Sequence, residues 1–269
     1  MPSAAPDWAQ AFLHMHTVAL SCAAMNACRH LLLLAGSGEA RAIAKGLQTN
    51  SQWRVTASLV RPPRDGQGLD TPMRFGALDD VSALETFVRA HDVDAILDAT
   101  HPFSQSMSRT AARVARALQL PHAQVLRRPW TMRSDAWVQV RDVRGAAARL
   151  QPDQRVFTNI GQDGLADLSR SGATIFARRL GAETGGADIE NVTYIFGKAP
   201  FSIAEELDLF QRLNIDVLVT KNTGSMAAQS KLDAALALEL PVVLIAPPDP
   251  ADQSALQTAQ DALDWVASL

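Results

Sequence analysis

Cysteine, aromatic residues and net charge are all scarce in this chain of 269 residues. The two cysteines, Cys22 and Cys28, exclude a disulfide scaffold and a zinc site, and they favour a reducing compartment. Aromatic residues make up only 6% of the chain while Ala and Leu abound, which suits helices packed on sheets better than an all-β sandwich. The net charge of -3 argues against a nucleic-acid partner, because such a partner calls for a clear basic excess.

Long apolar runs and a basic N-terminal stretch are also missing. No apolar run approaches the roughly 18 to 20 residues that a membrane span needs. Residues 17–25 are mildly apolar, but no Lys or Arg precedes Arg29, so the basic start of a signal peptide is lacking. We therefore expect a cytoplasmic protein without a membrane segment, in which residues 1–29 form an N-terminal extension. No motif indicates a metal site, and none indicates an oligomeric state.

Short apolar runs alternate with segments of helical periodicity through the rest of the chain. The first series has expected strands at 30–35, 55–60, 95–99 and 123–126. A second series begins at 156–160 and ends with a helix at 254–266. Continuous apolar strands between helices are typical of parallel sheets that helices cover on both faces. We predict an α/β protein with two Rossmann-like, doubly wound domains, residues 30–150 and 151–269, and a cleft between the domains.

In such sheets ligands bind beyond the carboxyl ends of the strands, so the residues after each strand are candidate site residues. The turn Gly36-Ser37-Gly38-Glu39-Ala40 follows the first strand, and its glycines and helix start suit a pyrophosphate. A tight structural turn is the alternative, because Arg41 stands where the usual fingerprint has its third glycine. Arg61 ends the second strand, where a basic residue, helped here by Arg64, suits the 2′-phosphate of NADP; an ordinary surface arginine is the alternative.

The segment Asp98-Ala99-Thr100-His101-Pro102-Phe103 follows another predicted strand. Thr100 is expected to cap a helix that runs from Pro102 to Leu118. We expect Asp98 and His101 at the cleft, where either side chain could carry a proton. A buried structural hydrogen bond for Asp98, and a capping or packing role for His101, stay open as alternatives.

The most polar strand end of the second series is Lys221-Asn222-Thr223-Gly224-Ser225. A lysine followed by Asn, Thr, Gly and Ser at a helix start suits a phosphate or a carboxylate. The segment is not a P-loop, because its lysine precedes the glycine. An ordinary polar connection between strand and helix is the alternative.

Taken in chain order, these strand ends resemble those of the precorrin-6A reductase family. The matching segments are Gly38 to Arg41, Ser58-Leu59 with Arg61, Asp98 to Phe103, Lys198 to Ser202, Val219 to Gly224 and Lys231 to Ala235. The resemblance spans roughly residues 30–246. It departs from the family pattern at Ser37 and Thr223, which are mild changes, and at Ala199, which replaces a glycine before Pro200.

The resemblance implies an oxidoreductase of cobalamin biosynthesis that uses NADPH to reduce the tetrapyrrole precorrin-6A to precorrin-6B. A hydride would reach one ring carbon and a proton its neighbour. The implied catalytic residues are Asp98 and His101. The implied cofactor-binding residues are Gly36, Ser37, Gly38, Glu39, Ala40, Arg61, Thr100, Lys221 and Asn222. The implied residues for the substrate's carboxylate arms and ring are Arg41, Arg109, Arg178, Lys198, Phe201, Ser202 and Lys231.

Three other interpretations stay open. The substrate could carry cobalt, as in the anaerobic variant of the pathway. The fold would equally serve another nucleotide-dependent enzyme, such as a glycosyltransferase. A two-lobed binding protein is the third possibility, but that class is usually exported and no signal peptide is evident.

Overall fold

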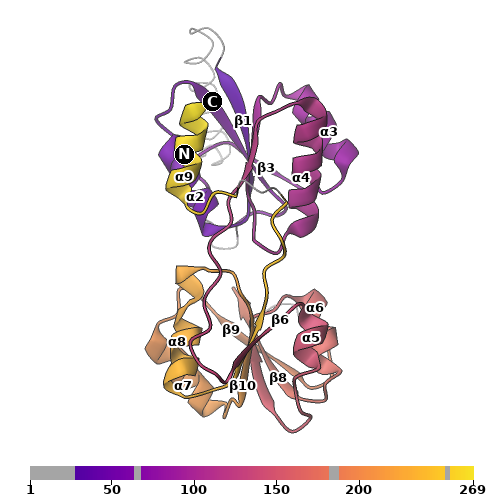
Figure 1. Cartoon of the computed structure of the whole chain (residues 1–269), viewed down its shortest axis with the longest axis vertical. Helices are drawn as coiled ribbons and strands as arrows, with labels where there is room; N and C mark the ends of the chain where they lie inside the picture. Colours follow the sequence, from indigo (N-terminus) through magenta and orange to yellow (C-terminus); the bar gives the residue numbers. More distant parts are fainter. Residues whose placement is uncertain (1–27, 64–67, 182–187, 252–254) are drawn as a thin grey trace, which may run out of the picture. The chain divides into compact units, whose positions relative to one another are not determined.

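The computed structural model describes residues 28–63, 68–181, 188–251 and 255–269 (Figure 1). The chain divides into two compact units, one that ends at Leu126 and regains Asp249–Leu269, and one formed by Arg127–Pro248. Each unit holds one sheet of parallel strands with helices on both of its faces, which confirms the predicted fold class. The predicted extension lies outside the described residues except for Cys28 and Arg29, and the first strand already begins at Arg29.

The sheet of the first unit has the strand order β3-β2-β1-β4-β5. Its strands are β1 (Arg29–Ala35), β2 (Trp53–Leu59), β3 (Met73–Phe75), β4 (Ala95–Ala99) and β5 (His122–Gln124). Its helices are α2 (Gly38–Leu47), α3 (Val81–Ala90), α4 (Gln105–Leu118) and α9 (Ala259–Ser268). Side chains of a strand alternate between the faces of its sheet. Leu31 and Leu33 of β1 therefore pack with α2 and α9, while Leu32 and Leu34 pack with α3 and α4.

The end of the chain completes the first unit. Leu256 forms a parallel bridge with Val125 next to β5, at the sixth position of the Rossmann strand order 3-2-1-4-5-6. Helix α9 then packs beside α2, where a Cβ on Gly46 would lie 2.7 Å from the Leu263 side chain (Figure 1). The structure thus differs from the predicted division at residue 150. A helical pattern shows which face of a helix is apolar, but not which sheet that face will meet.

The sheet of the second unit has the strand order β6-β11-β10-β7-β8-β9. Its strands are β6 (Trp137–Val140), β7 (Arg155–Thr158), β8 (Thr174–Leu180), β9 (Val192–Gly197), β10 (Val217–Lys221) and β11 (Val242–Ile245). Its helices are α5 (Val143–Ala147), α6 (Gln162–Ser169), α7 (Ile203–Arg212), η1 (Met226–Ala228) and α8 (Ser230–Ala237). The predicted first domain, residues 30–150, included the residues of β6 and α5, for which no strand or helix was predicted. Strand β6 pairs with β11 and belongs here.

Helices α7 and α8 cover one face of the second sheet, over a core that includes Phe157, Leu218 and Leu244. Helices α5 and α6 pack together on the other face. Ser202 caps α7 in a full capping box with Glu205, as the spacing of these two residues predicts. Among the described residues, no helix has the length and apolar character needed to cross a membrane.

Candidate functional site

The carboxyl ends of β1 and β4 form the topological switch point of the first sheet. The chain leaves β1 for α2 on one face, and it leaves the neighbouring strand β4 for α4 on the opposite face. Diverging connections leave a crevice at this edge of an open α/β sheet, and such crevices bind ligands. Two predicted segments, Gly36–Ala40 and Asp98–His101, meet at this switch point.

Ser37 ties the two segments together. Its hydroxyl accepts a hydrogen bond from the Ala40 backbone N–H at 3.3 Å, as the cap of α2, and donates to the Ala99 carbonyl at 2.8 Å. Gly36 is packed against the second segment, because a Cβ there would lie 3.1 Å from the His101 nitrogen. The tight structural turn therefore accounts for Gly36. Gly38 differs, because a Cβ there would meet no atom of the described residues within 4 Å, so these residues leave space beside the first turn of α2.

Asp98 is a buried carboxylate with one unpaired oxygen. Its side chain belongs to a residue that is only 1% exposed, and Oδ1 accepts a hydrogen bond from the Thr100 backbone N–H at 3.0 Å. Oδ2 has no hydrogen-bond partner among the described residues. A buried polar atom without a partner costs about 1 to 3 kcal/mol. The structural hydrogen bond, which was the alternative role for Asp98, is present, and it engages only one of the two carboxylate oxygens.

His101 is exposed, and its Nδ1 accepts a hydrogen bond from the Phe103 backbone N–H at 3.2 Å. A neutral imidazole that accepts at Nδ1 carries its proton on Nε2, so the outer nitrogen is a donor. The predicted cap at Thr100 is wrong. Ser104 precedes α4, and its backbone N–H donates to the His101 carbonyl at 2.7 Å in a turn that delays the helix to Gln105.

The other predicted cofactor residues of the first unit differ in availability. Glu39 is half-buried in the first turn of α2. Ala40 is 1% exposed within the core, and its backbone N–H already donates a hydrogen bond to the Ser37 hydroxyl. Arg61 is exposed beyond the end of β2, and its guanidinium forms no hydrogen bond or ion pair within the described part of the chain. Arg64, an expected helper of Arg61, lies outside the described residues.

The remaining two predicted cofactor residues, Lys221 and Asn222, belong to the second unit. Lys221 is half-buried at the end of β10; burial lowers the pKa of its ammonium group, while the nearby Asp163 carboxylate acts against that shift. Asn222 is fully buried. Its Oδ1 accepts a hydrogen bond from the Trp130 backbone N–H at 2.7 Å, and its Nδ2 donates to the Trp130 carbonyl at 2.9 Å. The amide of Asn222 is thereby committed to the chain itself.

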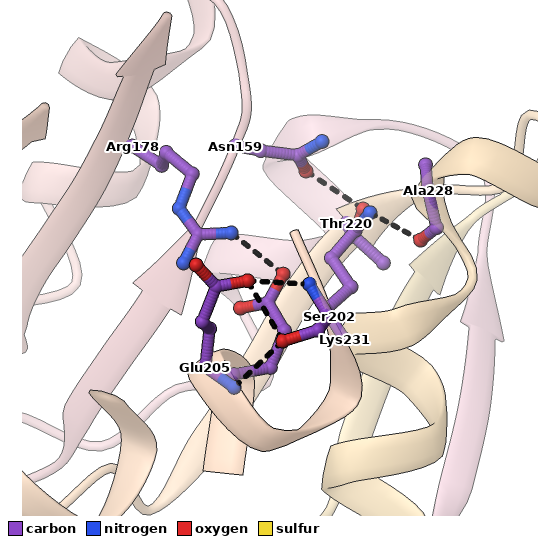
Figure 2. Close-up of polar contacts among 8 residues, drawn as sticks. Asn159, Arg178, Ser202, Glu205, Thr220, Ala228 and Lys231 are labelled. Carbon is purple, nitrogen blue, oxygen red and sulfur yellow. Dashed lines mark hydrogen bonds and ion pairs between the residues drawn. The ribbon is translucent and has the colours of Figure 1, made fainter. Parts of the chain in front are cut away.

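Two of the predicted substrate residues, Arg178 and Lys231, are labelled in Figure 2, and they form a buried cluster with Glu206. Arg178 Nη1 donates to Glu206 Oε1 at 2.6 Å. The guanidinium also stacks between two aromatic rings, with its central carbon 4.7 Å from the Phe157 centroid and 3.9 Å from that of Phe201. An internal ion pair and two rings therefore surround Arg178, and Phe201 is part of that packing.

Lys231 adds a second cation to this cluster. It is 4% exposed, and its Nζ donates to the Ala228 carbonyl at 2.6 Å (Figure 2). Burial lowers the pKa of Lys231 from 10.5 to about 8, an effect that Glu206 opposes and Arg178 reinforces. With all three groups ionised the cluster carries one net positive charge. Glu206 Oε2 has no hydrogen-bond partner among the described residues.

The other predicted substrate residues are spread over the surface. Arg41, Arg109 and Lys198 are exposed, and Arg41 donates to the Gly68 carbonyl at 3.1 Å. The Ser202 hydroxyl is committed to its capping box, where it accepts from the Glu205 backbone N–H and donates to the Glu205 carboxylate. In the described part of the chain, no group of three or more His, Cys, Asp or Glu could hold a metal ion.

Glu206 was not predicted, although the sequence carries a signal for it. The residue lies three and four positions before Leu209 and Phe210, on the buried face of α7. A carboxylate on an apolar helix face calls for a buried partner, and Arg178 is that partner. Trp130, in contrast, lies in a stretch without periodicity, and no sequence signal indicates its pairing with Asn222.

The fold and the site define a two-unit, Rossmann-like α/β protein whose first sheet has its topological switch point between β1 and β4. Residues 30–267 match the family model described as "Precorrin-6x reductase CbiJ/CobK". The chain belongs to this family, and it is a reductase.

Similar proteins include a precorrin-6A reductase of Rhodococcus erythropolis, 37% identical over 89% of this chain and 98% of the relative. A cobalt-precorrin-6A reductase of Priestia megaterium is 26% identical over 81% of this chain and 90% of that protein. The solved structure named "CobK precorrin-6A reductase" has a TM-score of 0.80 and 28% identity, and the match covers 89% of this chain and 96% of that one. The similarity therefore spans both units.

Proposed function

We propose that the protein reduces precorrin-6A to precorrin-6B with NADPH bound at the β1–β4 switch point. The observation that carries the proposal is the pairing of open space at Gly38 with an unpaired, buried carboxylate oxygen on Asp98. Both features belong to segments that Ser37 ties together. A nicotinamide cofactor supplies the hydride, and the chain supplies orientation and charge.

The choice of NADPH over NADH rests on Arg61. An acidic residue after the second strand of a Rossmann sheet favours NAD, because it accepts hydrogen bonds from the ribose 2′-hydroxyl. Here the position beyond β2 is held by an exposed arginine whose guanidinium is not engaged by the described part of the chain. A guanidinium suits a phosphate because it donates two parallel hydrogen bonds.

The choice of the cobalt-free substrate rests on the relatives. The chain is 37% identical to a protein named precorrin-6A reductase and 26% identical to one named cobalt-precorrin-6A reductase. The carboxyl edge of the second sheet also suits a large ring. Exposed apolar side chains lie at the ends of three of its strands or after them: Leu180 ends β8, Ile203 begins α7 after β9, and Met226 lies in η1 after β10. Such side chains suit the apolar faces of a tetrapyrrole.

In this proposal Asp98 and His101 handle the second half of the reaction. The ring carbon beside the one that receives the hydride must gain a proton. A protonated Asp98 could supply it, and its unpaired Oδ2 is the atom that would carry it. The Nε2–H of His101 would donate a hydrogen bond that orients the cofactor or the substrate.

The test combines cofactor choice with substrate choice. The purified protein is titrated with NADPH and with NADH, and nicotinamide absorbance is followed with precorrin-6A and with cobalt-precorrin-6A. We expect saturable NADPH binding and faster turnover of the cobalt-free substrate. The Arg61→Ala variant should bind NADPH about tenfold more weakly, as the loss of charge-assisted contacts predicts, with NADH binding unchanged. Equal affinity of wild type and variant for NADPH would rule out this role of Arg61.

A further inference from the structure

The loop after β10 holds another part of the chain through three consecutive residues. Asn222 pairs with both backbone polar groups of Trp130, at 2.7 and 2.9 Å. The carbonyl of Thr223 accepts a hydrogen bond from Arg127 Nη1 at 3.1 Å. Gly224 packs directly on Arg128, whose carbonyl oxygen would lie 2.1 Å from any Cβ at that position. Residues 127–130, here called the linker segment, are therefore fixed at almost every position.

Each of these contacts restricts the residue type. A side-chain amide has a donor and an acceptor side by side, so Asn can pair with a backbone N–H and C=O together, whereas Asp cannot donate. Gly224 is a glycine for two independent reasons, its φ of +63° and its contact with Arg128. Asn222 is itself anchored, because its backbone N–H donates to the Ile245 carbonyl of β11 at 2.8 Å.

The linker segment is also fixed beyond the loop. The Trp130 ring lies 5.7 Å from Lys231 Nζ and packs against the core beneath α7 and α8. Three residues later, Arg133 forms an ion pair with Asp233 of α8 at 2.7 Å. The chain passes from the first unit to the second between Leu126 and Arg127. It returns at Pro248–Asp249, within a Pro247-Pro248-Asp249-Pro250 stretch in which the prolines restrict the backbone.

We propose that Asn222 and Gly224 are positioning residues for the reduction, and that they act by fixing the linker segment where the chain enters the second unit. This inference rests on the proposed function. The polar loop after β10 then binds the protein's own backbone, although the sequence of the loop suits a phosphate. Loss of the contacts with the linker segment should therefore impair catalysis and leave cofactor affinity intact.

The experiment uses the full chain and three variants. Asn222→Ala removes both hydrogen bonds to Trp130, and Asn222→Asp keeps the acceptor for the Trp130 N–H but loses the donor. Gly224→Ala pushes on the Arg128 carbonyl without removing a polar group. Gly172→Ala is the matched control, because Gly172 also has a positive φ, +80°, but lies before β8 at the opposite edge of the same sheet.

Three quantities are measured: hydrogen exchange of the Trp130 amide, the Kd of NADPH, and kcat and KM for precorrin-6A. Amide exchange should speed up at least about tenfold in Asn222→Ala, the size expected for a lost hydrogen bond, and less in Asn222→Asp. We expect kcat/KM to fall at least about tenfold in Asn222→Ala and in Gly224→Ala, with an intermediate fall in Asn222→Asp. The Kd of NADPH should stay within about twofold, and the control should keep the wild-type kcat/KM per folded protein.

Two outcomes would overturn the inference. If Trp130 exchanges faster in Asn222→Ala or Asn222→Asp while kcat/KM stays at the wild-type value, the contacts serve stability alone. If NADPH affinity falls about tenfold or more, the loop binds the cofactor as its sequence suggests. Failure of the proposed function is seen separately, because the wild-type protein would then not oxidise NADPH with precorrin-6A at all.

Discussion

The two units present a glycine-bearing polar turn at the same edge of their sheets, and the two turns are filled differently. In the first unit, no atom of the described residues would lie within 4 Å of a Cβ on Gly38, and Asp98 Oδ2 on the neighbouring strand end lacks a partner among them. Beside Gly224 in the second unit lies the protein's own backbone, and Asn222 has both amide atoms paired. Turns of similar residue types thus differ: the described chain leaves space beside Gly38, and it fills the space beside Gly224.

The difference shows what a glycine in such a turn means. Glycine permits close approach, but it does not specify what approaches. At Gly36 the loop after β4 approaches, and at Gly224 the linker segment does. At Gly38 no atom of the described residues would lie within 4 Å of a Cβ. Gly38, the position without such a contact, is therefore the glycine that favours a ligand site.

The largest effect, on the rate of reduction, is expected from replacing Asp98, which is the proposed proton donor at the β1–β4 switch point. We expect Asp98→Asn to bind NADPH normally and to lose at least about tenfold in the rate of precorrin-6A reduction, because a positioned acid contributes about a hundred- to ten-thousandfold. The Asn side chain keeps an oxygen for the Thr100 N–H, so the loop should stay folded. Pre-steady-state measurement of the nicotinamide absorbance at saturating cofactor gives the rate of the reduction step.

A wild-type rate in a folded Asp98→Asn variant that binds both ligands would make Asp98 structural, with solvent as the proton donor. Ser108→Ala, which removes a buried hydroxyl that bonds to Gln124 in the same unit, provides a control for general loss of stability.

The second prediction concerns Lys231 of the second unit. This buried cation has no carboxylate of its own, because Glu206 pairs with Arg178. Lys231→Met keeps the side-chain length and leaves the Arg178–Glu206 pair balanced. At pH 7 it should raise the free energy of unfolding by about 1 to 3 kcal/mol, since the fall in the Lys231 pKa from 10.5 to about 8 corresponds to about 3 kcal/mol. Denaturant unfolding at a series of pH values measures the difference.

The pH dependence of unfolding shows whether the Lys231 charge lowers or raises the stability of the folded protein. Below about pH 8 the amine is protonated in both the folded and the unfolded state, so the penalty for burying the charge is fully present. Between about 8 and 10.5 the folded protein releases the proton first, and the wild type gains stability as the pH rises. The advantage of Lys231→Met should therefore be constant below pH 8 and fade above it. A variant that is less stable than wild type at pH 7 would contradict this account.

The sequence predicts the parallel α/β architecture well because the strands are continuous apolar runs such as Leu31–Leu34, buried on both faces. It also places Gly36–Ala40 and Asp98–His101 on strand ends that meet. It does not predict that α9 returns to the first unit, because that depends on long-range packing against α2. Nor does it separate Gly38 from Gly224, because the environment of a glycine is set by segments about a hundred residues away, such as the linker segment that meets Gly224.

The smallest expected effect tests the open turn itself. Gly38 is the first residue of α2, and nothing in the described structure lies within 4 Å of a Cβ there, so Gly38→Ala and Gly38→Val should both fold with little change in melting temperature. If the cofactor's pyrophosphate approaches this turn, the added side chain must displace it. We expect the Kd of NADPH to rise about fivefold to tenfold in Gly38→Val, on the order of 1 kcal/mol, and less in Gly38→Ala.

Gly161 provides the matched control, because it precedes α6 in the second unit and no atom of the described residues would lie within 4 Å of a Cβ there. Gly161→Val should leave the Kd of NADPH unchanged if the cofactor binds at the first unit's switch point. Isothermal titration of the three variants against NADPH separates the possibilities. A graded loss at Gly38 with no loss at Gly161 supports the open turn as the cofactor site, whereas equal affinities for all three variants would leave the open space at Gly38 without a ligand and remove the main support for NADPH at this edge.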